Sequence, residues 1–179
     1  VTDEFVTRFL DFAVGFENMF DIDDTKSKKI LDEARAFLQH KKTSDKDSAE
    51  IRAIKGLIRR CEASATCRYV GLTDAQMHFQ NLPFYETGLV EKSPIGEADF
   101  VLIAALIEKI QPHQIYAAGD LADPHGTHKV CLDGIFEAVK RLKQKAFMQH
   151  CWLWLYKGAW AEWDIDLIEM AVPMSPDQV

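Results

Sequence analysis

The sequence predicts an α/β fold with a doubly wound, mostly parallel sheet and helices on both of its faces. Strand-like apolar segments alternate with helical segments in the second half of the chain, which favours parallel pairing. The run 151–156 is almost entirely apolar, as expected of a strand that is buried on both faces. A length of 179 residues with 47% apolar residues suits one domain with a sizeable core.

The N-terminal part of the chain predicts three helices. Phenylalanines over 5–20 recur at three- and four-residue steps, which is typical of an amphipathic helix. Thr25 is the predicted N-cap of a second helix, which runs as far as Leu38. An exposed loop over 40–48 follows, and a third helix over 51–70 ends at the next glycine.

The second half predicts strands that alternate with helices, the pattern of a Rossmann-like sheet. The strands are short apolar runs bounded by proline, glycine or polar residues, and the helices carry apolar residues at helical spacing. In chain order we expect a strand over 77–82, a loop over 84–96, a helix over 97–110, a strand over 113–118, a helix over 128–145, a strand over 151–156 and a fourth strand over 164–172.

The expected sheet is incomplete at both ends. Three helical segments precede the first predicted strand, so the early strands of a doubly wound sheet are absent from the sequence. Ser175 and Pro176 have the character of a helix start just before the last residues. We therefore expect 1–179 to form a single domain, truncated at both ends. Unpaired strand edges and the apolar face of the helix over 5–20 should promote self-association.

Composition and charge argue against several classes of protein. The net charge of −7 argues against broad nucleic-acid binding, which needs a basic face. No apolar run approaches the roughly 20 residues that span a bilayer, and the first residues do not resemble a signal peptide. The four cysteines include no C-x-x-C pair, so reduced thiols in a cytoplasmic protein are expected.

The segment 123–128, Asp-Pro-His-Gly-Thr-His, places two histidines at the junction of a predicted strand and helix. A helix that starts near Pro124 would put His125 and His128 on one face, at the strand end where open α/β sheets build their sites. One imidazole could then ligate a metal while the other acts as an acid or oxyanion partner. A polar helix start with two surface histidines, capped by Asp123, is an equal alternative.

Several stretches resemble the PIG-L/LmbE-like metal-dependent amidohydrolases. Segment 58–72 is similar to the R-x-x-E-A…A-x-x-x-G stretch of that family, and 123–128 falls where the family carries its second histidine motif, H-P-D-H. Segments 82–88, 117–131 and 169–179 resemble the C-terminal LmbE-like region of Bacteroidetes proteins named glucosamine-6-phosphate isomerase (deaminase).

The resemblance implies roles for particular residues. Members of the family remove N-acyl groups from amino sugars or their conjugates, usually with zinc. His128 matches the third metal ligand, and His125 matches the acid that stabilises the oxyanion. Arg59 matches the arginine that meets the sugar or its substituent, whereas Glu62 matches a structural position. The implied partner is an amino sugar or a sugar phosphate.

The sequence also departs from the family pattern. It contains no A-H-P-D-[DE] motif, which in the family supplies two metal ligands and the general base. Thr127 replaces the acidic residue of H-P-D-H, and Phe84 stands where relatives often have aspartate. Because a catalytic zinc site keeps three protein ligands, we expect zinc in the intact domain but not in this chain alone. The chain alone should therefore be inactive.

Two functions stay open at this point. The chain is either a fragment of a zinc-dependent N-deacetylase domain in a larger amino-sugar protein, or a non-catalytic domain beside a deaminase. In the second case it would bind a sugar phosphate or mediate assembly. An A-H-P-D-[DE] motif upstream in a longer chain would favour the enzyme.

Overall fold

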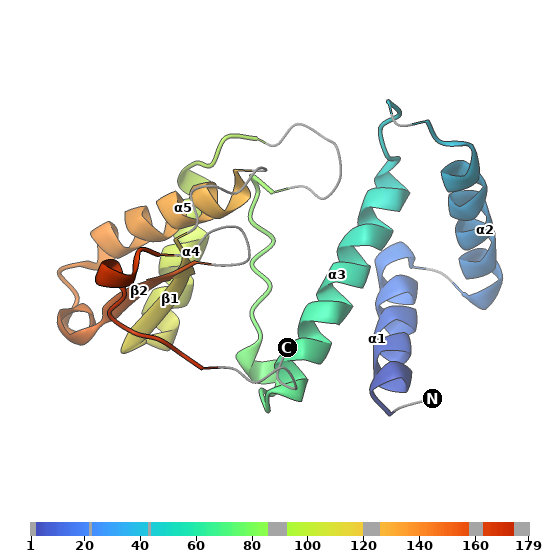
Figure 1. Cartoon of the computed structure of the whole chain (residues 1–179). Coiled ribbons are helices and arrows are strands. Elements are labelled where there is room, and N and C mark those ends of the chain that lie inside the picture. Colours follow the sequence, from blue (N-terminus) through green and yellow to red (C-terminus); the bar gives the residue numbers. More distant parts are fainter. Residues whose placement is uncertain are drawn as a thin grey trace. The chain divides into compact units, whose positions relative to one another are not determined.

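The computed structural model describes residues 3–21, 23–42, 44–85, 93–119, 126–157 and 163–173. The chain divides into two compact units, Val1–Pro94 and Ile95–Val179 (Figure 1). The described residues form helices and a small parallel sheet, which agrees with an α/β class. The doubly wound sheet and the single domain stay predictions. No helix in the described ranges is long and apolar enough to cross a membrane.

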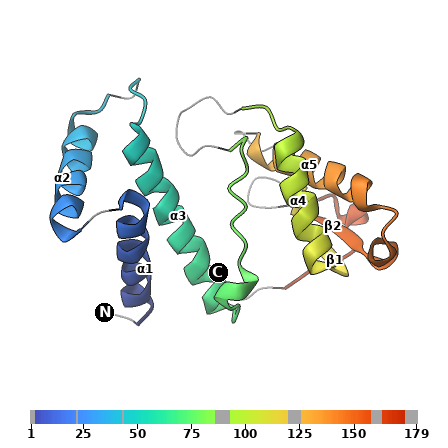
Figure 2. The same cartoon turned by 180° about the vertical axis from the view of Figure 1, so that it is seen from behind.

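The first unit is built on three helices, α1 (Asp3–Phe20), α2 (Asp24–His40) and α3 (Ala49–Tyr69), as the apolar periodicity predicts. Figure 1 and Figure 2 show α1 alongside α3. The two helices approach closely at Gly15, where an added Cβ would lie 2.6 Å from Cδ1 of Leu57. Their core consists of Phe16, Leu57 and Cys61, with Phe12, Phe20, Ile30 and Ile54 packed around it.

The start of α2 differs from its prediction. Asp23, not Thr25, is the N-cap, and its Oδ1 accepts hydrogen bonds from the backbone N–H groups of Thr25 and Lys26 at 3.1 and 3.0 Å. A carboxylate there satisfies two donors that a helix start leaves unpaired. Ser48 caps α3 in the same way, accepting from the N–H of Ile51 at 3.3 Å.

The predicted strand over 77–82 is wrong. The 3-10 helix η1 (Asp74–Gln76) precedes this segment, and no strand forms within it. Asn81 has a φ of 45°, a left-handed conformation that interrupts extended backbone. Arg60 of α3 donates to Oδ1 of Asn81 at 2.5 Å and lies 5.0 Å from the ring centroid of Phe79. The segment therefore packs on α3 through side chains instead of entering a sheet.

The second unit contains a β-α-β arrangement. Strand β1 (Gln114–Ala118) pairs in parallel with β2 (Trp152–Tyr156), and α5 (Thr127–Leu142) lies between them in sequence. Helix α4 (Glu97–Ile110) has the predicted bounds and packs on α5, which in turn packs on β1. The 3-10 helices η2 (Ala146–His150) and η3 (Ile165–Leu167) complete the unit.

Contacts between α4 and α5 hold the second unit together. An added Cβ on Gly134 would lie 2.8 Å from Cδ1 of Ile95 and 2.9 Å from Cδ1 of Ile103, so the two helices approach closely here. The guanidinium of Arg141 makes a bidentate pair with Glu97, both distances being 2.7 Å, and it also contacts Glu137 at 3.2 Å. Buried apolar residues on the two helices include Ile103, Ile107, Leu132, Ala138 and Leu142.

The strand predicted over 151–156 is confirmed, but its predicted burial is wrong, and so is the predicted fourth strand. The run 151–156 forms β2 but is not buried on both faces, because Trp152 is 67% exposed and Tyr156 is 52% exposed. In the described part of the unit, β2 pairs with β1 alone. Over 164–172 the chain forms η3 and irregular backbone instead of a fourth strand.

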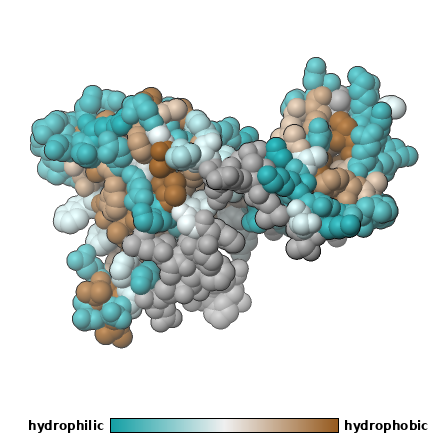
Figure 3. All heavy atoms as spheres, turned by 90° about the horizontal axis from the view of Figure 1, so that it is seen from above, coloured by the Kyte–Doolittle hydropathy of each residue, from teal (hydrophilic) through white to brown (hydrophobic). Residues whose placement is uncertain are grey.

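Apolar side chains also reach the surface, where Figure 3 shows brown atoms among teal ones. On α1, Phe12 and Phe16 belong to the α1–α3 core, whereas Phe9, Leu10 and Val14 are exposed. The face of this helix that is open to a partner therefore differs from the phenylalanine face that the sequence predicts. Self-association itself stays a prediction.

Candidate functional site

The predicted histidine site belongs to the junction between β1 and α5. The backbone N–H of Gly119, just after β1, donates to the carbonyl oxygen of Tyr156 at 2.7 Å, so the carboxyl ends of both parallel strands meet at one edge. Helix α5 begins at Thr127, and Gly126 occupies the N-cap position with a φ of 67°. This strand end is where open α/β sheets place their ligands.

His128 lies in the first turn of α5 and is exposed. His125 and Asp123 lie outside the described residues. The N-cap of α5 is Gly126, so the helix begins later than the predicted start near Pro124. Of the two histidines, α5 contains His128, so the alignment of both imidazoles on one face stays a prediction.

The described residues do not form a complete metal centre. Within these ranges no group of three histidine, cysteine or carboxylate side chains could hold a metal ion. A catalytic zinc needs three protein ligands and an open position for water or substrate. His128 alone at the junction does not meet that requirement, so its role as a ligand stays a prediction for the longer protein.

Arg59 lies in the first unit, on the exposed side of α3. No hydrogen bond or ion pair to Arg59 is formed within the described part of the chain, and Glu62 is exposed one turn away without contacting it. Arg59 is at the rim of a groove of about 420 Å³, which we call the arginine groove. The groove is lined by Met19, Ala53, Gly56, Leu57, Arg59, Arg60, Phe79, Asn81 and Tyr85.

Four polar or aromatic residues of the arginine groove were not predicted from sequence: Arg60, Phe79, Asn81 and Tyr85. One signal was available, because Arg60 has no acidic residue three or four positions away on α3, although ion pairs at that spacing are favourable on helices. The contribution of 79–85 could not be foreseen, since it depends on how that segment packs on α3.

The chain has a clear relative among known proteins. It is 48% identical, over 182 aligned positions, to a glucosamine-6-phosphate deaminase-like protein of Bacteroides thetaiotaomicron. The alignment covers 100% of this chain but 28% of the relative, so the chain spans a little over a quarter of the length of the curated protein it matches. No family model matches the chain, and no solved structure matches it.

Proposed function

We propose that this chain is part of an amino-sugar protein, in which it contributes to a zinc-dependent N-deacylase site. The observation that carries the proposal is the position of His128, exposed in the first turn of the helix that follows β1, at the carboxyl edge of a parallel strand pair. The motif around it resembles the second histidine motif of the LmbE-like amidohydrolases. The name of the 48% identical relative supports the amino-sugar context.

In this proposal His128 is one of three zinc ligands, and His125 donates to the oxyanion of the tetrahedral intermediate. Zinc at such a site would polarise the amide carbonyl and activate a water molecule. The other two ligands and the general base are proposed to come from an A-H-P-D-[DE] motif elsewhere in the complete protein, because this sequence has none. The chain by itself is therefore proposed to be inactive.

A second candidate function is a non-catalytic domain that binds a sugar phosphate beside a deaminase. The arginine groove favours it, since Arg59, Arg60, Phe79 and Tyr85 line one hollow in the first unit. This alternative needs no metal and no histidine chemistry.

Zinc content and deacylation of N-acetylglucosamine derivatives by the complete protein separate the two functions. An N-deacylase should hold about one zinc per chain, and His128→Ala should lose both metal and activity. His150→Ala is the matched control, because His150 is also exposed in the second unit but does not lie at the strand–helix junction. A complete protein that shows no zinc-dependent hydrolysis would refute the N-deacylase and leave the binding domain.

A further inference from the structure

The arginine groove has a charge that is unusual for this chain. The net charge is −7, yet the lining holds two arginines and no carboxylate. Arg68 and Arg141, by contrast, are neutralised by acids: Arg68 is paired with Asp11 and Asp74, and Arg141 is paired with Glu97 and Glu137. The guanidinium groups of the groove have no such partner in the described part of the chain, so the groove suits an anionic ligand.

Arg60 is held in place by neutral groups. It donates to Oδ1 of Asn81 at 2.5 Å, and its guanidinium stacks over the ring of Phe79 at 5.0 Å from the centroid. Neither contact cancels the positive charge, and each restricts the side chain before a ligand arrives. A guanidinium has five N–H donors in a planar fork, and the contact with Asn81 uses Nη2 only. The remaining donors can bind two oxygens of a phosphate.

Two aromatic residues also line the groove. Phe79 is 41% exposed and Tyr85 is 50% exposed, although both line the hollow. Exposed rings beside fixed polar groups are typical of sites that bind one apolar face and one polar end of a small molecule. A volume of about 420 Å³ is within the usual range for small-molecule sites.

We propose that the arginine groove binds a hexose phosphate, with its phosphate monoester on Arg60 and Arg59 and the C–H face of its sugar ring against Phe79 and Tyr85. The inference rests on the proposed function in one respect, because that function indicates that the sugar is an amino sugar. It does not require the metal site.

Isothermal titration calorimetry on the 179-residue chain tests the groove with three probes: glucosamine 6-phosphate, glucosamine and inorganic phosphate. Glucosamine 6-phosphate should bind with one site per chain, and each partial ligand should bind at least about 10-fold more weakly, because each makes only part of the contacts. Arg60→Ala should weaken binding by about 10-fold or more, with a smaller loss for Arg60→Lys, which keeps the charge but not the fork.

Arg35→Ala is the matched control, since Arg35 is an exposed arginine on α2 that does not line the groove. It should leave the affinity unchanged, and circular dichroism should show that all variants remain folded. No binding at about 10 mM sugar phosphate would overturn the inference. Equal affinity for inorganic phosphate would do so too, as would equal losses in Arg35→Ala and Arg60→Ala. Because no zinc and no hydrolysis are measured, such a result is distinct from a failure of the N-deacylase proposal.

Discussion

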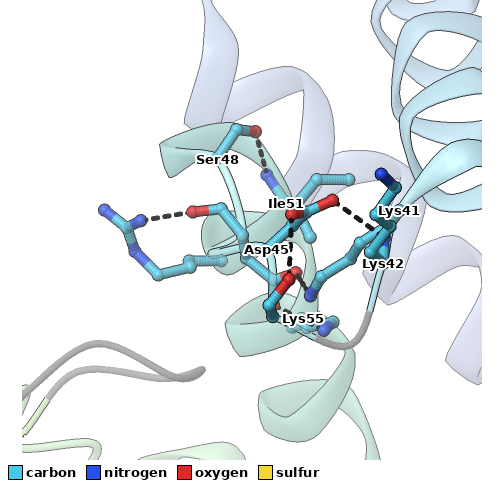
Figure 4. Close-up of polar contacts among 9 residues, drawn as sticks. Lys41, Lys42, Asp45, Ser48, Ile51 and Lys55 are labelled. Atoms are coloured by element: carbon cyan, nitrogen blue, oxygen red, sulfur yellow. Dashed lines mark hydrogen bonds and ion pairs between the residues drawn. The ribbon is translucent and has the colours of Figure 1, made fainter.

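The ammonium nitrogen of Lys55 lies 2.6 Å from Oδ2 of Asp47, a carboxylate that is 3% exposed at the turn between α2 and α3. Lys41 donates to the other carboxylate oxygen, and Arg52 donates to the backbone carbonyl of Asp47 at 2.7 Å. Figure 4 shows Lys41, which follows α2, and Lys55 of α3 at this turn. The hydrogen bonds from Lys41 and Lys55 hold the pKa of Asp47 below its ordinary value. The carboxylate therefore joins α2 to α3 as long as it is ionised.

The first prediction is that Asp47 makes the stability of the chain depend on acid pH. A folded pKa below the unfolded value of about 4 means that the stabilisation is present above pH 4 and is lost as pH falls through the folded pKa. At neutral pH, Asp47→Asn should lower the free energy of unfolding by about 2–3 kcal/mol, somewhat less than for a fully buried pair because Lys55 is partly exposed. The loss should shrink toward pH 3.

Urea denaturation at pH 7 and pH 3 measures this difference. Asp32→Asn is the control, because Asp32 is an exposed carboxylate on α2 without an ion pair in the described residues. The pKa values of Glu97 and Glu137 are also lowered, in both cases chiefly by hydrogen bonds from Arg141. Both carboxylates are present in wild type and variant, so the difference between the two free energies of unfolding reports on Asp47. An Asp47→Asn loss that is the same at both pH values would refute the linkage.

The helices could be predicted from sequence because their signal is local. The apolar spacing of α1 and α4 depends on neighbours within one or two turns, and α4 begins and ends at the predicted residues. The strand expected over 77–82 was wrong because Asn81 adopts a left-handed conformation beside Arg60, a residue distant in sequence. Apolar composition alone did not indicate that contact.

The candidate site was predictable only where motifs are contiguous. His128 lies at the strand–helix junction as expected, because β1 and α5 are consecutive elements. The arginine groove combines α1, α3 and the segment around Asn81, so its composition depends on packing that no single motif encodes. Spacing did indicate that Arg60 lacks an acidic neighbour on α3, but not which groups would surround it.

The second prediction concerns Gly119, which follows β1. An added Cβ would lie 2.9 Å from Cβ of Leu155, an atom fixed to the backbone of β2 that cannot rotate away. Gly119→Ala should therefore force the two strands apart and destabilise the chain by about 1–3 kcal/mol, the usual cost of overpacking. Gly96→Ala is the control for the added methyl group, because a Cβ there would meet no atom within 4 Å, and it should cost only the loss of a favourable N-cap residue. Thermal unfolding that is unchanged in Gly119→Ala would show that the strand pair adjusts freely.

The third prediction is that the exposed face of α1 mediates self-association. Phe9 is 60% exposed, and Leu10 and Val14 are exposed beside it on the same helix. Light scattering of the chain should show a mass that rises with concentration over tens of micromolar, as apolar surface of this kind tends to be covered. Leu10→Glu should reduce the association, whereas Leu38→Glu, an equally exposed position on α2, should not. A monomer at every concentration would contradict this prediction.

The fourth prediction concerns metal binding by the chain alone. With His128 as its single proposed ligand, the 179-residue chain should bind zinc no better than about millimolar, since a structural or catalytic site needs three or four ligands. Elemental analysis after dialysis should find less than about a tenth of an equivalent. His128→Ala should make no further difference to that content. One retained zinc per chain, lost in His128→Ala, would show that this sequence builds a metal site by itself.

The last prediction separates the roles of the two histidines in the complete protein. If His128 ligates zinc, His128→Ala leaves two protein ligands, so metal and deacylase activity should be lost together. If His125 donates to the oxyanion, His125→Ala should keep its zinc and its substrate affinity while kcat falls by about 10²–10³, the usual cost of one transition-state donor. Zinc content measured alongside steady-state kinetics on N-acetylglucosamine derivatives distinguishes these patterns, with His150→Ala as the control. A complete protein in which both histidines can be replaced without loss of hydrolysis would place the chemistry elsewhere and leave this chain the role of a binding domain.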